Sequence, residues 1–282
     1  MMQNITWKTI GEHSPSDLTE ARLQLHYAVQ LVAAAGETLT PAQPDASQAS
    51  LSWDLDQSAF VGALIPAQTP FRIALHPSTL TVMIWDLQGV AIAALDLDQQ
   101  TLAAGFDWLN RELAQLGVTQ TLVPLTYPPD FPDHAIAQGA NFDLSQTAAL
   151  QAFADYYSNT AQLLTAIVST TPNASPVRIW PHHFDMATLV SLPGTQNGEP
   201  KSVGLGFSPG DSSYNEPYWY VTPWPYPVDK SPLPPLSGNG FWHTQSWVGA
   251  VLRGSQLAVP DRAAPVQAFL TTAFQGAQVL LS

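Results

Sequence analysis

The sequence predicts an α+β fold in which antiparallel sheets are flanked by helices. Segments with apolar residues at helical spacing open and close each half of the chain, and short runs rich in Val, Ile, Leu and aromatic residues lie between them. These short runs follow one another too closely to leave room for crossover helices, so neighbouring strands should pair antiparallel. We therefore expect two degenerate, pseudo-symmetric α-β(3–5)-α halves.

In the first half, one helix should begin at the capping residues 16–17 and end at Gly36, and another should run from Thr101 to Leu116. His26 lies beside the apolar stripe of the first helix, so we expect its ring to pack rather than to react. The strands expected between the helices are Leu51–Leu55, Ala59–Ile65, Phe71–Leu75, Leu80–Trp85 and Val90–Leu97.

A proline-rich connector, residues 121–144, should separate this first half, residues 1–120, from the second half, residues 145–282. The second half should begin with a helix from Ser145 to about Val168 and close with one from Pro265 to Leu280. The strands expected in it are Val177–Trp180, Ala187–Leu192, Val203–Phe207, Tyr218–Thr222 and Trp242–Leu252.

The order of elements in the two halves suggests an internal repeat. Each half contains a helix, a Thr-Pro exit, several strands and a closing helix, and Trp53 aligns with Trp180. On this alignment His182, His183 and Asp185 fall opposite Leu55, Asp56 and Ser58, so both histidines lie in the second copy. We therefore expect the chemistry in the second copy and a scaffold role for the first.

Composition excludes several classes of partner. Nine basic residues face twenty-two acidic ones, giving a net charge of −13, so the chain lacks the basic face that nucleic acids or anionic membranes require. There is no cysteine, which excludes disulfides and thiolate chemistry. No signal peptide and no long apolar span are visible, so we expect a soluble, cytoplasmic protein.

The candidate site is the stretch around the paired histidines. If His183 and Asp185 lie on one strand, their side chains share a face about 7 Å apart, which suits two ligands of one metal or a histidine oriented by a carboxylate. His182 would then point to the other face with Trp180. Pro181 indicates an edge strand or a bulge, which could re-aim either histidine.

Further candidates lie downstream in the second half. Glu216 joins His183 and Asp185 as a catalytic candidate, and a divalent metal is one cofactor that histidine and oxygen ligands would suit. Without a known metal, nucleotide or hydrolase motif, a purely structural role for these side chains stays open. The residues expected to contact a ligand are Trp180, His182, Asp211, Tyr218, Trp219 and His243.

The blocks Trp180-x-x-x-Phe184-Asp185-x-Ala187 and Gly206-Phe207-x-Pro209-Gly210-Asp211, with Glu216-Pro217 beyond, resemble those of an uncharacterised bacterial protein family of unknown function. The resemblance covers most of the chain, including the N-terminal Leu23-x-Leu-His26 and Phe71-Arg72-Ile73 blocks, but the paired histidines depart from it. It implies where a site lies and nothing about its chemistry.

Two functions stay open. The first is a small-molecule pocket in the C-terminal half, in an acid–base or metal-assisted enzyme or in a protein that only binds its ligand. The second is a non-catalytic binding or assembly module in which the Pro/aromatic segment 214–235 contacts a protein partner or a second copy of the chain. The sequence does not decide whether the protein is an enzyme.

Overall fold

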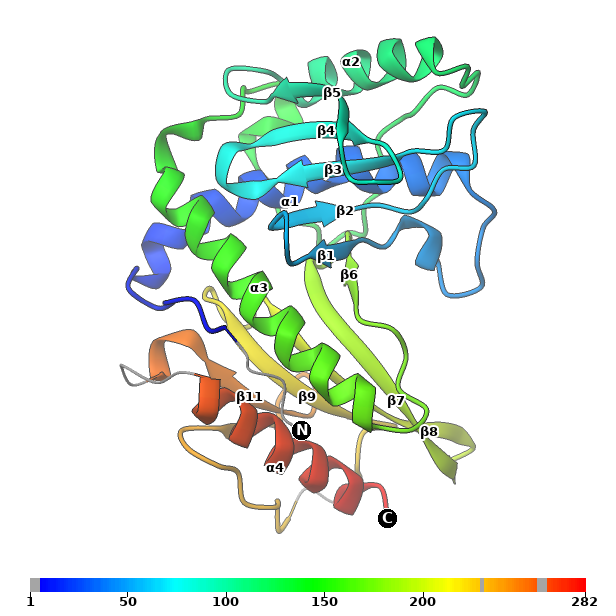
Figure 1. Cartoon of the computed structure of the whole chain (residues 1–282). Coiled ribbons are helices and arrows are strands. Elements are labelled where there is room, and N and C mark those ends of the chain that lie inside the picture. Colours follow the sequence, from blue (N-terminus) through cyan, green and yellow to red (C-terminus); the bar gives the residue numbers. More distant parts are fainter. Residues whose placement is uncertain (1–5, 229–230, 258–262) are drawn as a thin grey trace. The chain divides into compact units, whose positions relative to one another are not determined.

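The computed structural model describes residues 6–228, 231–257 and 263–282 (Figure 1). These residues form two compact units that do not coincide with the halves of the sequence. The N-terminal unit contains residues 17–154 and the short segment 179–184. The C-terminal unit contains the described residues within 1–16, 155–178 and 185–282. Each unit therefore includes a piece from the other half of the chain.

The N-terminal unit is built on a meander of five antiparallel strands in the order β1-β2-β3-β4-β5. Helix α1 lies behind the middle of this sheet in Figure 1, where the side chain of Val32 approaches Gly62 on the backbone just after β2. The elements are α1 (Pro15–Leu39), β1 (Ser52–Asp54), β2 (Ala59–Val61), β3 (Arg72–His76), β4 (Thr81–Trp85), β5 (Ala91–Asp96) and α2 (Leu102–Gln115).

Helix α1 does not stop at Gly36, as the sequence suggested, but continues to Leu39. A Cβ atom at Gly36 would lie 2.1 Å from the backbone oxygen of Gln48. Glycine is therefore needed here because another segment passes close to the helix, and not because the helix ends in a left-handed residue.

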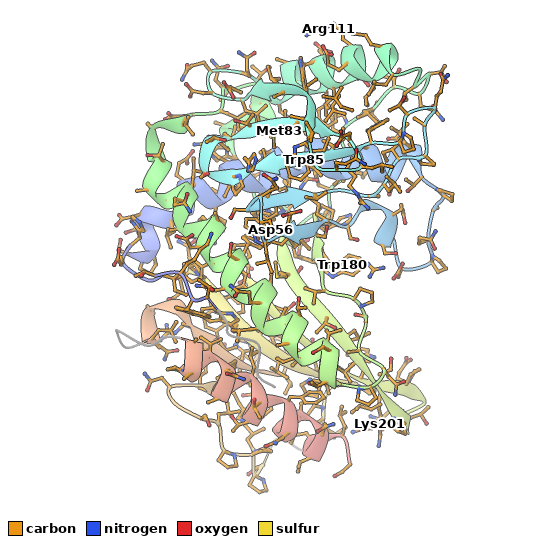
Figure 2. All side chains as sticks on the ribbon, in the orientation of Figure 1. Asp56, Met83, Trp85, Arg111, Trp180 and Lys201 are labelled. Carbon is orange, nitrogen blue, oxygen red and sulfur yellow. The ribbon has the colours of Figure 1, made fainter. Side chains whose placement is uncertain are left out.

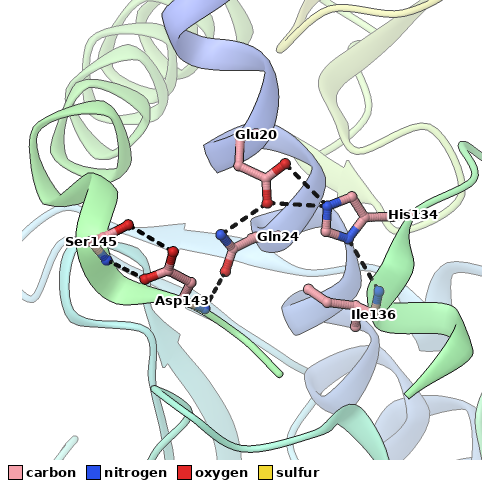
Figure 3. Close-up of polar contacts among 6 residues, drawn as sticks. All are labelled: Glu20, Gln24, His134, Ile136, Asp143 and Ser145. Carbon is pink, nitrogen blue, oxygen red and sulfur yellow. Dashed lines mark hydrogen bonds and ion pairs between the residues drawn. The ribbon is translucent and has the colours of Figure 1, made fainter. Parts of the chain in front are cut away.

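The proline-rich connector is anchored to the N-terminal unit by polar contacts (Figure 3). The backbone N–H of Ile136 donates to Nδ1 of His134 over 3.4 Å, which leaves the Nε2 proton to donate to Glu20 of α1 at 3.1 Å. Gln24, one turn further along α1, accepts from the backbone N–H of Asp143 at 2.8 Å. The connector thus packs against α1 as part of the unit.

The C-terminal unit is built on the second sheet, in the order β10-β11-β9-β8-β7-β6. Strand β6 and helix α3 lie where the chain passes between the units, so each contributes residues to both. The elements are α3 (Thr147–Thr170), β6 (Arg178–Trp180), β7 (Asp185–Gln196), β8 (Glu199–Ser208), β9 (Tyr218–Trp224), β10 (Phe241–His243), β11 (Gly249–Arg253) and α4 (Ala263–Leu280).

This sheet has six strands, where three to five were expected. Strand β11, and not β10, lies beside β9, so the last two strands do not follow the order of the sequence. The predicted strand Trp242–Leu252 is in fact two, β10 and β11, joined by the turn at residues 244–248. Proline lacks the N–H that a central strand must donate. The proline-rich chain that follows β9 therefore does not pair beside it, and β11 takes that place while β10 forms the edge.

Helices α3 and α4 cover one face of the second sheet (Figure 1). On β9, Trp219 is fully buried on this face, and its indole N–H donates to the hydroxyl of Thr160 on α3 at 3.1 Å. The described part of the chain forms four helices and two antiparallel sheets, which confirms the predicted α+β class. Among the described residues, no helix has the length and apolar character needed to cross a membrane.

Candidate functional site

The paired histidines lie in a turn and not on a strand. Strand β6 ends at Trp180, residues 181–184 form the turn, and β7 begins at Asp185. Phe184 has a φ of 58°, a left-handed conformation that reverses the chain instead of extending it. The expectation that His183 and Asp185 share one strand face is therefore wrong, because the strand on which that spacing depended does not exist.

The turn at 181–184 is a packing element of the N-terminal unit. The carbonyl oxygen of Pro181 accepts hydrogen bonds from the side chains of His26 and Gln30 on α1, each at 2.9 Å. Phe184 is fully buried, and its ring stacks on His26 with centroids 5.2 Å apart. Burial lowers the pKa of His26 to about 3, so its ring is neutral at physiological pH. The packing role expected for His26 is confirmed.

Trp180, His182 and His183 belong to the N-terminal unit, whereas the chain from Asp185 onward belongs to the C-terminal unit. His183 is exposed and His182 is partly buried. Within the part of the chain that the structure describes, no three His, Asp or Glu side chains are grouped so that they could hold a metal ion.

The remaining candidates gather on the face of the second sheet opposite α3 and α4. Side chains alternate along β9, so Tyr218 and Tyr220 point away from the face on which Trp219 is buried. Cross-strand register brings Ser208 and Arg253 onto the same face as Tyr218. Trp219, expected to contact a ligand, instead lies in the core under the helices.

Two tyrosine–aspartate pairs organise this face. The hydroxyl of Tyr218 donates to Oδ2 of Asp211 at 2.5 Å, and the hydroxyl of Tyr220 donates to Oδ2 of Asp185. Burial raises the pKa of both tyrosines, and the nearby carboxylates raise it further. Both phenols therefore keep their protons and act as donors. Asp211 also accepts from the backbone N–H groups of Ser213 and Tyr214 at 2.7 and 3.0 Å, which fixes the loop before β9.

Glycines on the neighbouring strands let aromatic rings lie across this face. A Cβ atom at Gly206 of β8 would lie 2.5 Å from the ring of Tyr220, and one at Gly249 of β11 would lie 2.4 Å from the ring of Trp247. Any larger residue at either position would push the ring off the sheet. The glycines of this part of the sequence therefore shape the aromatic surface.

His243 lies at the edge of the same face, between two aromatic residues. Its Nδ1 is 2.8 Å from the hydroxyl of Tyr214, and its ring stacks on Trp247 with centroids 4.4 Å apart. Its Nε2 is 3.4 Å from the hydroxyl of Ser246. Partial burial lowers the pKa of His243, and this effect outweighs the opposite effect of the charge on Asp211. The lowered pKa favours a neutral imidazole at physiological pH.

Glu216 makes structural contacts at the end of this face. Its carboxylate accepts from the backbone N–H of Ser255 at 2.9 Å and lies 3.6 Å from the guanidinium of Arg253. Only 9% of Glu216 is exposed. Its oxygens tie β11 to the loop before β9, which fits a structural role better than the catalytic role expected from the sequence.

We call the surface formed by Asp185, Asp211, Tyr214, Tyr218, Tyr220 and His243 the tyrosine face. It unites four residues that the sequence singled out, Asp185, Asp211, Tyr218 and His243. Tyr220 was missed although its signal is visible: on a strand, a residue shares its face with the second residue along and not with the next. That rule pairs Tyr218 with Tyr220 and separates both from Trp219.

A second feature lies in the N-terminal unit, where only a scaffold was expected. A hollow of about 330 Å³ opens on the face of the five-stranded sheet opposite α1. Cross-strand register places the side chains of Ser52, Val61, Arg72 and Trp85 on this face. The hollow is lined by Ser52, Trp53, Asp54, Val61, Arg72, Trp85, Asp86, Leu87, Gln88 and Gly89.

Comparison with known proteins does not extend this description. No family profile, no curated protein and no solved structure matches the chain.

Proposed function

We propose that the protein binds a small molecule on the tyrosine face of its C-terminal unit, with His243 as the group that meets the ligand. The observation that carries this proposal is the position of His243, which is partly exposed and held between Tyr214 and Trp247. A histidine fixed on both sides yet reachable from solvent is typical of recognition and of proton transfer.

The surroundings of His243 define the ligand's chemistry. Trp247 and Phe241 provide apolar ring surface, and Tyr214 provides a hydroxyl beside the imidazole. A ligand that suits these groups has an apolar face and a hydrogen-bonding group directed at the imidazole. If the ligand is also a substrate, the neutral imidazole of His243 is the group able to accept a proton from it. The proposed acid–base role thus passes from His183 to His243.

The test compares two histidines that differ in position. Purified wild-type protein would be screened by thermal shift against a metabolite library, and each hit would be retested on His243→Gln and His183→Gln. We expect His243→Gln to lose the stabilisation by the ligand and His183→Gln, an exposed change in the N-terminal unit, to keep it. The opposite pattern would return the site to the paired histidines. If every hit stabilises all three proteins equally, the tyrosine face is removed from consideration.

An assembly role has support from a different surface. At the end of β9 and just beyond it, Trp224, Tyr226 and Val228 are 46%, 40% and 83% exposed. Exposed aromatic and apolar side chains in sequence are favoured at protein interfaces. Sedimentation of Trp224→Ser beside wild type tests this role: a wild-type dimer that the variant loses would support it, and two identical monomers would oppose it.

We also propose that the two halves arose by duplication, on the evidence of two turns. The four-residue turns 55–58 and 181–184 each follow the first strand of a half and precede the second. Each ends in a non-glycine residue with positive φ, Ser58 at 51° and Phe184 at 58°. The test is a superposition of experimental coordinates, in which α1 to β4 should overlay α3 to β9. A cytoplasmic location is a separate proposal, and cell fractionation tests it.

A further inference from the structure

The hollow in the N-terminal unit has walls of three different kinds. Trp85 of β4 is 4% exposed, and its indole N–H is directed to the sulfur of Met83 at 3.4 Å (Figure 2). Because the N–H is engaged there, Trp85 lines the hollow without offering it a hydrogen-bond donor. Val61 on β2 extends this apolar wall as part of the same buried cluster. One side of the hollow is therefore apolar, and little of either side chain is exposed there.

Arg72 supplies the only cation among the residues that line the hollow. It lies directly across from Trp85 in the register of β3 and β4. Its Nη1 donates to the carbonyl oxygen of Gly62 at 2.9 Å, which fixes the orientation of the guanidinium. A guanidinium carries five N–H groups in a planar fork, so an arginine held by one bond retains donors for a carboxylate.

Two carboxylates, Asp54 and Asp86, line the same hollow as this cation. Asp54 accepts from the backbone N–H groups of Asp56 and Gln57, and Asp86 accepts in the same way from Gln88 and Val90. These bonds hold the two loops at the rim and use Oδ1 of each residue. The lining thus carries one positive and two negative charges, which disfavours a phosphate or another polyanion as the ligand.

We propose that this hollow is a second ligand site, separate from the tyrosine face, and that it binds a small aromatic zwitterion such as an aromatic amino acid. The carboxylate of the ligand pairs with Arg72, its ammonium group lies toward Asp54 and Asp86, and its ring packs on Trp85. A hollow of about 330 Å³ is at the small end of the range of ligand pockets, which suits a molecule of this size.

The first test asks whether the ligand needs both its carboxylate and its ammonium group. Isothermal titration of the full chain would use L-phenylalanine and L-tryptophan, with 2-phenylethylamine and 3-phenylpropionate as probes that lack the carboxylate and the ammonium group. We expect at least one amino acid to bind and both half-molecules to bind about tenfold more weakly or worse, because each loses a charge-assisted contact. Equal binding of 3-phenylpropionate would overturn the zwitterion assignment, and no binding by either amino acid would overturn the site.

The second test locates the site on the sheet. Arg72→Gln should weaken amino-acid binding about tenfold or more, and Asp54→Asn, which keeps an acceptor for the turn, should weaken it without unfolding the unit. Arg111→Gln on the exposed side of α2 removes the same charge away from the hollow and should bind as wild type (Figure 2). If Arg72→Gln has a wild-type melting profile and wild-type affinity, the ligand binds elsewhere. His243→Gln should not change this affinity, so the two proposed sites can fail independently.

Discussion

Acid should destabilise the N-terminal unit through the single buried ring of His26. The ring donates from Nε2 to the oxygen of Pro181 and stacks on Phe184, and only 5% of the residue is exposed. Burial lowers its pKa from 6.5 to about 3, and the charges of Arg22 and His183 act in the same direction, against the hydrogen bonds to the backbone. The folded protein therefore keeps His26 neutral over a range in which the unfolded chain binds a proton.

The sign and size of the effect follow from proton linkage. Between pH 6.5 and about 3 the unfolded chain holds one more proton at this site, so stability rises with pH and is lost as the pH falls. Each pH unit inside this window corresponds to about 1.4 kcal/mol. Lowering the pH from about 6.5 to about 4.5 should therefore cost about 2–3 kcal/mol of unfolding free energy. The loss should begin near pH 6.5 and level off near pH 3.

Urea unfolding at several pH values from about 7.5 to about 4.5 measures this loss directly. His26→Gln keeps an N–H donor but cannot titrate, so it should be less stable near neutral pH and much less sensitive to acid. A smaller slope should remain, because burial also lowers the pKa of His76 and His243. His13→Gln serves as the matched control and should retain the wild-type profile. An acid profile of His26→Gln as steep as that of wild type would refute the reasoning.

Three other predictions can be checked on purified protein. Gly36→Ala, normally favourable in a helix, should lower the free energy of unfolding by about 2 kcal/mol or more, because its Cβ would meet backbone at 2.1 Å. Gly105→Ala should cost less, because its Cβ would meet only the side-chain ends of Leu31 and Leu97. Tyr220→Phe should cost about 1.5–3 kcal/mol in urea unfolding by removing the donor to Asp185, whereas Tyr226→Phe at a 40% exposed site should cost little. With a net charge of −13, the protein should give no gel shift with duplex DNA at physiological salt, and a micromolar, salt-sensitive shift would contradict this.

Much of the fold could be predicted because the spacing of apolar residues and the residues that begin or end a helix or strand are set within each short segment. The helix predicted over Thr101–Leu116 is observed as α2, with the hydroxyl of Thr101 accepting from the N–H of Ala104 as an N-cap should. The prediction that the helix ends at Gly36 was wrong because a contact distant in sequence decides the role of this glycine. Its role is set by Gln48, which approaches only in the folded chain, so no local pattern could distinguish it from a helix stop.

The candidate site was harder to predict because strand pairing decides which side chains share one face of a sheet. The spacing of His183 and Asp185 suits a strand, but whether a strand exists there is decided by the turn that ends at Phe184. Tyr214 and His243 are distant in sequence, and they meet because β11 and β10 fold back beside β9. Nothing in the sequence around either residue carries that information.

The two sheets differ in how side chains cover the face opposite their helices. A sheet face that no helix covers must be shielded by its own side chains or remain open to a ligand. In the second sheet, Gly206 and Gly249 leave room for the rings of Tyr220 and Trp247 against the sheet, and Val251 on the same face is fully buried. His243 lies partly exposed at the edge of this face. In the first sheet, Trp85 covers Met83 but not the neighbouring end of the face, where charged side chains stand in place of a second ring. A ligand would therefore meet an edge in the C-terminal unit and a charged cavity in the N-terminal unit, and the two should select different molecules.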